Sequence, residues 1–457
     1  MLNSVEEKLK QVEEALDPSS WSRCCIYRAP WCMVEYNKKA YRPSLVSLGP
    51  YHYGDEQLQG MEFHKYRALC CMLKRNCQYV FEYLHAVEEI EHEVRACYED
   101  MPDDFPSDKF VEMLVVDSCF ILEILLGNFF RKDFERLGYP KKDPVFSKAY
   151  ITDGILRDII LLENQIPLFV LERLHGIKPK DQRQQSVLQL VINVYNPCWL
   201  TQRSIASEVT LLEQCILSSC SENNTGMRHC LDIFRQTLMY DTSRPKSPRM
   251  QHIVIDMHNE GSLGLQSNSK NHENSDPKGQ LIPSATKLKE TGVKFMMVEN
   301  NFPFWNVEFE NGNMKIPQIV IDDGSELTFL NLMAFEQSHV PPKEAHITSY
   351  IALLDKLVNS ASDVAQLVED NVIVHTLGSD EQVAEMINSL AKGIYFSVED
   401  GCYAELYVKV NKYSNQKMNL WGAVLVRNYF SSPWAIIGLI AGALELMFSG
   451  KQAFGPQ

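Results

Sequence analysis

The feature that most constrains the fold is a long apolar stretch in the first half of the chain, FPSDKFVEMLVVDSCFILEILLGNFF, at residues 105–130. Its apolar residues fit helical spacing, but they cover most of the helix surface rather than one stripe. A helix of this kind is stable only when other parts of the protein surround it. The stretch therefore predicts a core helix that ends near Gly127.

A second apolar stretch, DGILRDIILLENQIPLFVLERLHG, starts at Asp153. Its first half places Ile155 and Ile159 on one helical face. Pro167 has no backbone N–H and its ring clashes with the preceding helical turn. We therefore expect the helix to kink or split near Ile166.

The segment FENGNMKIPQIVIDD in the second half has the pattern of a β-hairpin. Apolar residues alternate with glutamates before Asn311-Gly312, a pair that tolerates positive φ, and an apolar run follows. Pro317 suggests that the second strand is an edge strand or contains a bulge. The predicted fold class is mainly α with a small antiparallel β element (α+β) around Val307–Ile321, and with a single C-terminal hydrophobic helix.

Helical patterns return after the hairpin. ITSYIALLDKLVNSASDVAQLVEDNVI predicts two short helices with a boundary near Ser362-Asp363. In LGSDEQVAEMINSLAKG, Ser379 and Gln382 fit a capping box, and Gly393 fits a helix stop.

The domain organisation follows from these patterns and from residues 241–280, which are rich in Ser, Asn, Gly, Pro and charged residues. Such a segment buries too little apolar surface to offset the entropy of ordering it. The predicted parts are an N-terminal helix (1–20), a helical region (21–240), a linker or loop (241–280), a second region with the hairpin and helices (281–430), a hydrophobic helix (431–448) and a tail (449–457).

Composition excludes some classes of function. The formal net charge of −15 disfavours binding to the phosphates of a nucleic acid. The N-terminus lacks the basic and apolar regions of a secretory signal peptide, so we interpret the 13 cysteines as thiols in a reducing compartment.

Motifs that carry chemistry are scarce. The chain has no G-x-S-x-G, no P-loop and no dinucleotide fingerprint. Glu89 and His92 form an E-x-x-H pair, and we interpret it as a solvated charged face. We assign no catalytic residue, metal ligand or cofactor. A Cys–His site among two cysteines and two histidines stays an open alternative; these are Cys24, Cys25, His52 and His64.

Four carboxylates occur inside apolar helical stretches: Asp117, Glu123, Asp158 and Glu163. A buried carboxylate needs a cationic partner or several hydrogen-bond donors. We therefore expect these residues to pair with arginine or to cap backbone groups rather than to act as general acids.

The candidate binding surface is the turn in RPSLVSLGPYHYG. Gly49-Pro50 forces a turn, and Tyr51, His52 and Tyr53 follow it directly. Loops held by a scaffold often contact partners. The alternative is a structural turn whose aromatic rings close the core.

The C-terminal stretch YFSSPWAIIGLIAGALELMF is the candidate membrane helix. Its 20 residues span about 30 Å, which matches the hydrocarbon core. Trp434 suits the membrane interface, Glu445 lies near the other end, and Gly438 and Gly442 form a G-x-x-x-G pair that would allow a homodimer. The alternatives are a buried helix of a soluble body and an interfacial helix.

Several stretches together resemble the plant family known as domain-of-unknown-function 247. They are CCIYRAPWCMVEYNKKAYRPSLVSLGPYHYG, MEFHKYRAL, LLENQIPLFVLERL, IPSATKLKETGVKF, FENGNMKIPQIVIDD, LMAFEQ, LGSDEQVAEMINSLAKG and YFSSPWAIIGLIAGAL. The resemblance implies a mostly helical, plant-specific protein, usually with one C-terminal transmembrane segment and without established catalytic residues. Some grass members of the family are implicated in self-incompatibility as pollen-side determinants, which implies protein recognition.

The leading hypothesis is a non-enzymatic recognition protein in plant signalling or self-incompatibility-type recognition. Its partners would be other proteins, and a single C-terminal helix would anchor its cytosolic body to the plasma membrane or an endomembrane. The alternative is a soluble enzyme with an unrecognised Cys–His or metal-dependent site.

Overall fold

The structure, a computed structural model, describes residues 5–6, 9, 23–101, 105–130, 133–177, 185–195, 209–223, 228–240, 281–298, 303–416, 437 and 441–442, although not the side chains of Cys215 and of residues 218–223. This part of the chain is mainly helical with a few short strands in two small sheets, which confirms the predicted class. It divides into two compact units, and each is described by itself.

The first unit contains the described residues between 23 and 240, together with Asp322–Pro341 and Lys392–Tyr395. Its helices are α3 (Trp31–Tyr36), η1 (Lys38–Tyr41), η2 (Gln59–Met61), α4 (Glu62–Asn76), α5 (Val80–Glu88), α6 (Glu91–Arg95), α7 (Ser107–Phe129), η3 (Phe134–Leu137), α8 (Ala149–Ile159), α9 (Leu168–His175), α10 (Val187–Val194), α12 (Val209–Asn223), α13 (Cys230–Met239) and α15 (Ser325–His339).

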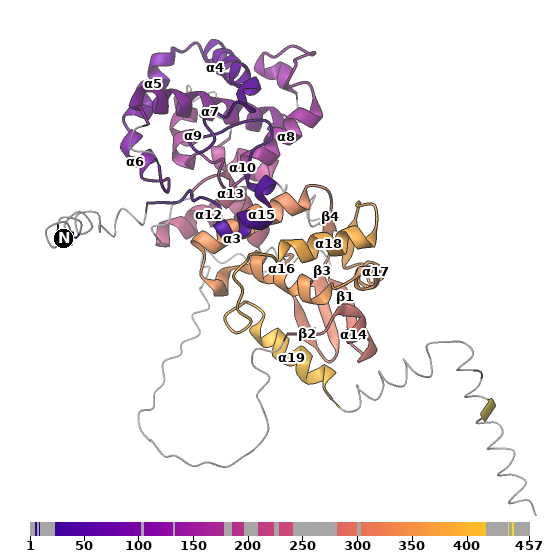
Figure 1. The fold of residues 1–457 in the computed structure, drawn as a ribbon. Coiled ribbons are helices and arrows are strands. Elements are labelled where there is room, and N and C mark those ends of the chain that lie inside the picture. The colour runs from indigo at the N-terminus through magenta and orange to yellow at the C-terminus, as the bar shows by residue number, and fades with distance from the viewer. Residues whose placement is uncertain are drawn as a thin grey trace, which may run out of the picture. The chain divides into compact units, whose positions relative to one another are not determined.

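Helix α7 is the predicted core helix, and it packs against α4, α5, α9 and α10 (Figure 1). Every residue from Met113 to Gly127 is buried, as the all-round apolar pattern requires. The helix continues to Phe129, two residues past the predicted end. Gly127 allows the ring of Phe134 to approach, because a Cβ atom there would lie 1.9 Å from its Cε1.

The second apolar stretch is split, as Pro167 predicts, but the first helix ends earlier than expected. Helix α8 stops at Ile159 and α9 starts at Leu168, with Pro167 as the N-cap residue. Residues 160–167 form a buried connection rather than the end of a helix. The side chains that replace the lost helical hydrogen bonds are described below.

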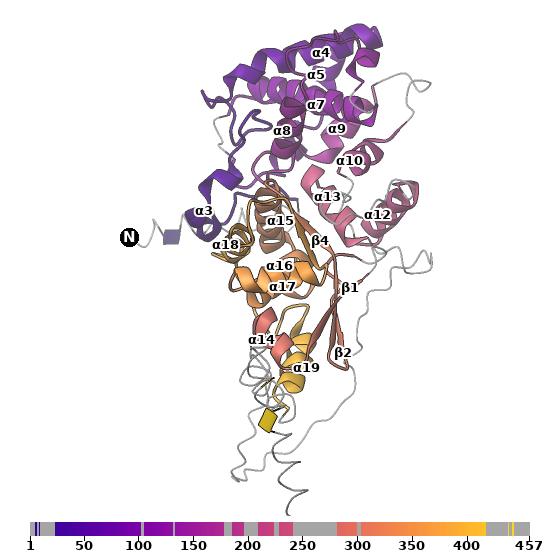
Figure 2. The same ribbon diagram turned by 90° about the vertical axis from the view of Figure 1, so that its right-hand side faces the viewer.

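The second unit contains the described residues of 281–321, Pro342–Ala391 and those of 396–416. Its elements are α14 (Ala285–Glu290), β1 (Lys294–Val298), β2 (Glu308–Glu310), β3 (Asn313–Pro317), β4 (Ile319–Ile321), η5 (Pro342–Glu344), α16 (His346–Leu357), α17 (Ala361–Glu369), β5 (Ile373–His375), α18 (Asp380–Leu390) and α19 (Ala404–Ser414). Figure 2 shows the strands beside these helices.

The predicted hairpin is present as the antiparallel pair β2–β3, with Glu310 opposite Asn313. Asn311 and Gly312 have φ values of 51° and 81°, as a two-residue hairpin turn requires. The prediction of an edge strand was wrong, because β3 lies between β1 and β2. Pro317 is tolerated there since it is the last residue of the strand.

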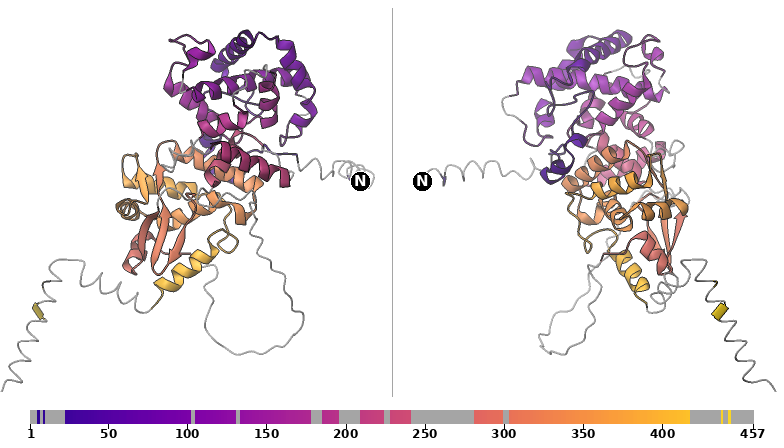
Figure 3. Two further views of the ribbon diagram at one scale, coloured as in Figure 1. Left: turned by 180° about the vertical axis from the view of Figure 1, so that it is seen from behind. Right: turned by 45° about the vertical axis from the view of Figure 1, so that its right-hand side comes forward.

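The remaining strand pairs are parallel rather than antiparallel: β1 pairs with β3, and β4 pairs with β5. Helix α19, in yellow in Figure 3, packs on β2, and the rings of Phe309 and Tyr413 meet edge to face at 5.6 Å. The Tyr413 hydroxyl also approaches the turn so closely that a Cβ atom at Gly312 would lie 2.4 Å from it.

The helix signals of the second half are largely confirmed. Ser379 caps α18 by accepting a hydrogen bond from the Gln382 N–H, and Gly393 follows with a φ of 76°. The predicted boundary near Ser362-Asp363 lies a few residues too late, because α16 ends at Leu357 and α17 starts at Ala361.

Several predictions concern residues outside the described part of the chain. These are most of the N-terminal helix, the linker 241–280, and the C-terminal helix apart from Ile437, Ala441 and Gly442. Trp434, Gly438 and Glu445 are therefore not placed. Among the helices that the structure describes, none has the length and apolar character needed to cross a membrane. The predicted domain limits remain predictions.

Candidate functional site

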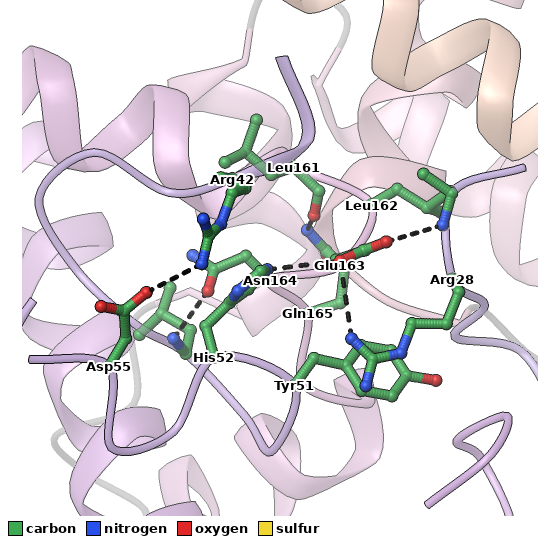
Figure 4. A network of polar contacts seen from close by, with 12 residues as sticks. Arg28, Arg42, Tyr51, His52, Asp55, Leu161, Leu162, Glu163, Asn164 and Gln165 are labelled. Atoms are coloured by element: carbon green, nitrogen blue, oxygen red, sulfur yellow. Dashed lines mark hydrogen bonds and ion pairs between the residues drawn. The ribbon is translucent and has the colours of Figure 1, made fainter. Parts of the chain in front are cut away.

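The turn after Gly49 and the connection 160–167 form one polar network in the first unit (Figure 4). The base of this network is the carboxylate of Asp158 at the end of α8. It accepts hydrogen bonds from the N–H groups of Ser44 (3.0 Å), Leu45 (2.7 Å) and Val46 (2.9 Å). Burial raises the pKa of Asp158, and these N–H groups oppose the rise. The carboxylate caps backbone groups, as predicted.

Asn164 binds the same segment, at residues 46 and 48, through its side-chain amide. Its Oδ1 accepts from the Leu48 N–H at 2.7 Å. Its Nδ2 donates to the carbonyl oxygens of Val46 (3.1 Å) and Asp158 (2.9 Å). Both N–H groups of its Nδ2 and one acceptor position of its Oδ1 are therefore bound to backbone groups.

Gln165 explains why α8 ends at Ile159. Its Nε2 donates to the carbonyl oxygens of Ile159 and Leu161, both at 2.6 Å, and its Oε1 accepts from the Leu231 N–H at 3.3 Å. A side-chain amide thus takes two carbonyls that a continuing helix would have paired. The sequence pattern alone does not reveal this replacement.

Asp117, from the core helix α7, holds the start of the turn. Its Oδ2 accepts from the Gly49 N–H at 2.9 Å, and its Oδ1 lies 2.7 Å from Nζ of Lys65. Burial raises the pKa of Asp117 to about 6, although Lys65 favours the carboxylate. Burial lowers the pKa of Lys65, but Asp117 and Glu62 outweigh it and the net shift is upward, so the lysine stays charged. Glu123 likewise pairs with Arg75.

Glu163 lies at the centre of the network in Figure 4. Its Oε1 accepts from the Ala29 N–H at 2.9 Å. Its Oε2 lies 3.6 Å from the Arg28 guanidinium and 3.5 Å from Nε2 of His52. The Arg28 guanidinium stacks on the ring of Tyr51, 3.9 Å from the ring centroid. Glu163 therefore links the segment before α3 to the turn.

The three residues of the candidate binding surface have different positions. The Tyr51 hydroxyl lies 2.9 Å from the carbonyl oxygen of Ile26 and 2.6 Å from that of Glu99. His52 is 8% exposed, and burial lowers its pKa to about 4, so its imidazole is neutral. Only Tyr53 is exposed, at 41%. A partner could therefore contact Tyr53 without any rearrangement, whereas Tyr51 and His52 face the interior.

The Cys–His alternative is not supported by the contacts of these residues. Backbone pairing places Cys25 beside Cys97, and His52 lies against Glu163. Burial raises the pKa of Cys24, which disfavours a reactive thiolate at neutral pH.

Two histidines that sequence reasoning missed meet at Cys25. Nε2 of His229 and Nε2 of His339 lie 3.2 and 2.8 Å from the Cys25 carbonyl oxygen. Burial lowers the pKa of His229 well below its usual value and that of His339 to about 4, so both rings are neutral. A neutral ring donates one hydrogen bond. For His339 we assign it to Cys25 rather than to the Phe335 carbonyl at 3.1 Å.

The described residues contain no group of three or more His, Cys, Asp or Glu side chains arranged to hold a metal ion. Glu89 forms an ion pair with Arg173 and lies 3.6 Å from Nε2 of His85 on the surface, which agrees with the interpretation of a solvated charged face.

The profile of a family described as plant protein of unknown function, domain-of-unknown-function 247, matches residues 26–448. The chain belongs to this family. UPF0481 protein At3g47200 of Arabidopsis thaliana is 30% identical over 448 residues, which cover 96% of this chain and 87% of that protein. Putative UPF0481 protein At3g02645 of the same plant is 26% identical over 490 aligned residues, which cover 94% and 89%. No solved structure matches the chain.

The stretches that carry the family resemblance include the polar connections described above. LLENQIPLFVLERL supplies Glu163, Asn164 and Gln165, and RPSLVSLGPYHYG supplies the backbone segment that they hold. LMAFEQ lies in α15, and LGSDEQVAEMINSLAKG forms α18 and its cap. In the first unit, these polar side chains are thus committed to internal contacts.

Proposed function

We propose that this member of the domain-of-unknown-function 247 family is a non-enzymatic recognition protein that binds an amphipathic helix of a partner protein. One observation carries the proposal, namely a stripe of exposed, mostly apolar side chains along α4 and the start of α5. We call it the α4–α5 surface. It consists of Phe63, Tyr66, Cys70, Lys74, Cys77, Tyr79, Val80 and Phe81.

The exposure of these side chains is unusual for a helix that packs on the core. Phe63 is 72% exposed, Tyr79 78% and Phe81 69%. Single exposed apolar residues need no explanation, but a contiguous group of large ones marks an interaction site. Aromatic residues are also those that contribute most to binding energy in protein interfaces.

The spacing along α4 fits a helical partner. Phe63, Tyr66, Cys70 and Lys74 follow one another at intervals of three or four residues, so they lie on one face of the helix, and Cys77 follows as the residue that caps its end. The stripe is about 21 Å long, or close to four turns. A second helix laid along it would bury its apolar face in the way of helix-in-groove recognition.

A groove of about 550 Å³ runs beside this stripe and is lined by Tyr66, Leu69, Leu73 and Tyr79 among others. It would take one or two large apolar side chains of the partner. Lys74 also lines it, and among the described ion pairs none involves this lysine. The partner helix should therefore place a carboxylate opposite Lys74.

The proposal includes a membrane tether. The support is the sequence of residues 431–448, whose apolar pattern predicts a helix of nearly bilayer length with Trp434 near one end and Glu445 near the other. The body would lie in the cytosol at the plasma membrane or an endomembrane, and Gly438 and Gly442 would allow a homodimer. Plant signalling, including self-incompatibility-type recognition, is the role that the family resemblance suggests.

Affinity purification from plant tissue tests the recognition surface. Three tagged full-length chains are compared: the natural chain, a surface variant and a control variant. The surface variant carries Phe63→Ser, Tyr79→Ser and Phe81→Ser. The control carries the same change at three exposed tyrosines outside the stripe, namely Tyr36, Tyr150 and Tyr395, which are 61%, 72% and 72% exposed. All three chains should show the same circular dichroism.

We expect at least one protein that both the natural chain and the control retain and that the surface variant loses at least tenfold, because each lost aromatic anchor costs about 1–2 kcal/mol or more. The purified partner should then bind Lys74→Glu more weakly. Recovery of the same proteins with all three chains would contradict the proposal.

Carbonate extraction tests the tether separately. The full chain should stay with the membrane pellet, and a chain that ends at Phe430 should be released. Release of the full chain would refute the tether and leave the α4–α5 surface in place as a recognition site of a soluble protein.

A further inference from the structure

Two cysteines of the first unit lie on backbone segments that run side by side. The N–H groups of Cys25 and Ile26 both donate to the Cys97 carbonyl oxygen at 2.9 Å, and the Glu99 N–H donates to the Ile26 carbonyl at 3.0 Å. These bonds form a parallel bridge between Ile26 and Tyr98. The register places Cys25 beside Cys97, so their side chains leave the two segments on the same face.

This backbone arrangement suits a disulfide. Paired backbone segments lie about 4.8 Å apart, and disulfides join residues whose Cα atoms are about 4.4–6.8 Å apart. The ten cysteines whose side chains the structure describes are all free thiols. Cys25 and Cys97 are therefore reduced here, in a geometry that needs little backbone movement to join them.

The two thiols are not equivalent. The Cys97 thiol donates to the Glu93 carbonyl oxygen at 3.3 Å, and the neighbouring Cys25 lowers the pKa of Cys97, although burial opposes this. The proximity of Cys97, with burial, raises the pKa of Cys25 well above its usual value. Cys97 is thus the thiol that ionises first, and Cys25 is the neighbour that can attack it once it is oxidised.

The surroundings hold Cys25 in this position. Its carbonyl oxygen accepts from the imidazoles of His229 and His339, on the segments that lead into α13 and end α15. The backbone cannot easily turn the Cys25 side chain away from Cys97, since that carbonyl would lose both contacts. Cys25 is 8% and Cys97 6% exposed, so a small oxidant reaches them more readily than a bulky one.

We propose that Cys25 and Cys97 are a modification site at which hydrogen peroxide forms an intramolecular disulfide. The Cys97 thiolate attacks one peroxide oxygen, the O–O bond breaks, and hydroxide leaves, which gives a sulfenic acid on Cys97. The Cys25 sulfur then attacks the Cys97 sulfur and the S–O bond breaks. Two thiols and one peroxide give one disulfide and two waters, and a small dithiol such as dithiothreitol reverses the change.

The disulfide would fix the segment before α3 to the segment after α6. It closes a loop of roughly 70 residues, which restricts the unfolded chain strongly. We expect the oxidised chain to melt about 5–10 °C higher than the reduced chain. The proposal is independent of the α4–α5 surface.

The test uses the purified full chain, reduced and then exposed to millimolar hydrogen peroxide. Free thiols are alkylated, and a tryptic digest is analysed without reduction. The site predicts a linked pair of peptides, CCIYR (residues 24–28) and ACYEDMPDDFPSDK (residues 96–109). The variant Cys24→Ser should still form this pair, and Cys25→Ser and Cys97→Ser should not. Cys230→Ser is the matched control, since Cys230 is also buried and burial raises its pKa to about 12.

Loss of the linked pair in Cys24→Ser would overturn the assignment, because Cys24 would then be the reacting residue. Oxidation of Cys70 or Cys77 while the 24–28 and 96–109 peptides stay unlinked would overturn the site itself. The melting shift gives a second readout, which should disappear on addition of dithiothreitol. A melting temperature that does not rise in a chain with the linked peptides would refute the proposed fixing of the two segments.

Discussion

Replacement of Asp158 tests whether the buried polar residues of the family stretches hold the fold. Asp158→Asn keeps the size of the side chain but turns one of its oxygens into an N–H donor. In the natural chain Oδ2 accepts from Leu45 and Val46, and Oδ1 accepts from Ser44. The amide can keep its oxygen toward Leu45 and Val46, but its nitrogen then faces the Ser44 N–H, which loses its 3.0 Å contact with Oδ1 and keeps only the longer 3.2 Å contact with the other oxygen.

The expected loss of stability follows from the number of orphaned donors. A hydrogen bond to a charged group is worth about 1.5–3 kcal/mol. Part of this loss is offset because the neutral amide of the variant costs less to bury than the carboxylate. We therefore expect Asp158→Asn to lower the free energy of unfolding by about 2 kcal/mol. Asp158→Ala removes the acceptor for all three N–H groups and should cost about 4 kcal/mol.

Urea unfolding and hydrogen exchange measure this prediction. Exchange should accelerate at the amides of Leu45 and Val46 in Asp158→Ala far more than at those of the core helix α7. Asp153→Asn, on the exposed side of the same helix, should stay within about 0.5 kcal/mol of the natural chain. A cost below 0.5 kcal/mol for Asp158→Ala, with unchanged exchange at Leu45 and Val46, would refute the reasoning.

Three further predictions concern single groups. His229 is neutral in the folded state because burial depresses its pKa, so unfolding takes up a proton below about pH 6.5 and stability falls by up to 1.4 kcal/mol per pH unit as the pH drops. His229→Gln should lower the total slope in urea titrations between pH 6.5 and 5 by this contribution, while His52 and His339, whose pKa values burial also lowers, keep theirs; an unchanged slope would contradict the assignment. Gly312→Ala should cost more stability than Gly54→Ala, since both have a φ of +81° but only Gly312 is approached by Tyr413; equal melting temperatures would argue against this contact. Gly127→Ala should cost about 1–3 kcal/mol in urea unfolding because it overpacks the core, and a neutral effect would show that the neighbouring ring can move.

The patterns that predicted correctly are local. The core helix was predictable because its apolar residues leave no polar face, and the turn at Asn311-Gly312 because few residues tolerate two successive positive φ angles. The cap at Ser379 was likewise predictable, because it depends only on residues within one helical turn.

The parts that could not be predicted depend on contacts between residues far apart in the sequence. Gln165 ends a helix by binding carbonyl oxygens, but its type and spacing also fit a helix interior. The position of β3 between two strands depends on the parallel pairing with β1, which no hairpin pattern contains. The convergence of His229 and His339 on Cys25 joins residues more than 100 positions apart.

The candidate binding turn shows the same limit. Its aromatic residues were identified, but whether an aromatic residue in a turn faces solvent or the core is a tertiary question. Two carboxylates decide it: Asp117, which is buried, accepts from the Gly49 N–H, and Glu163 lies 3.5 Å from Nε2 of His52. Conversely, the sequence of α4 fits an ordinary surface helix, and only the structure shows that Phe63 and Tyr66 belong to an exposed stripe.

The central claim is that a partner protein covers the α4–α5 surface, and two native thiols allow a direct measurement. Cys70 and Cys77 are exposed and line the groove, whereas Cys402 lies in the second unit. The alkylation rate of each thiol is measured by mass spectrometry on the purified chain, alone and in complex with its purified partner. The proposal predicts at least tenfold slower alkylation of Cys70 and Cys77 in the complex, with Cys402 unchanged. Equal rates at Cys70 and Cys77 with the partner bound would contradict it.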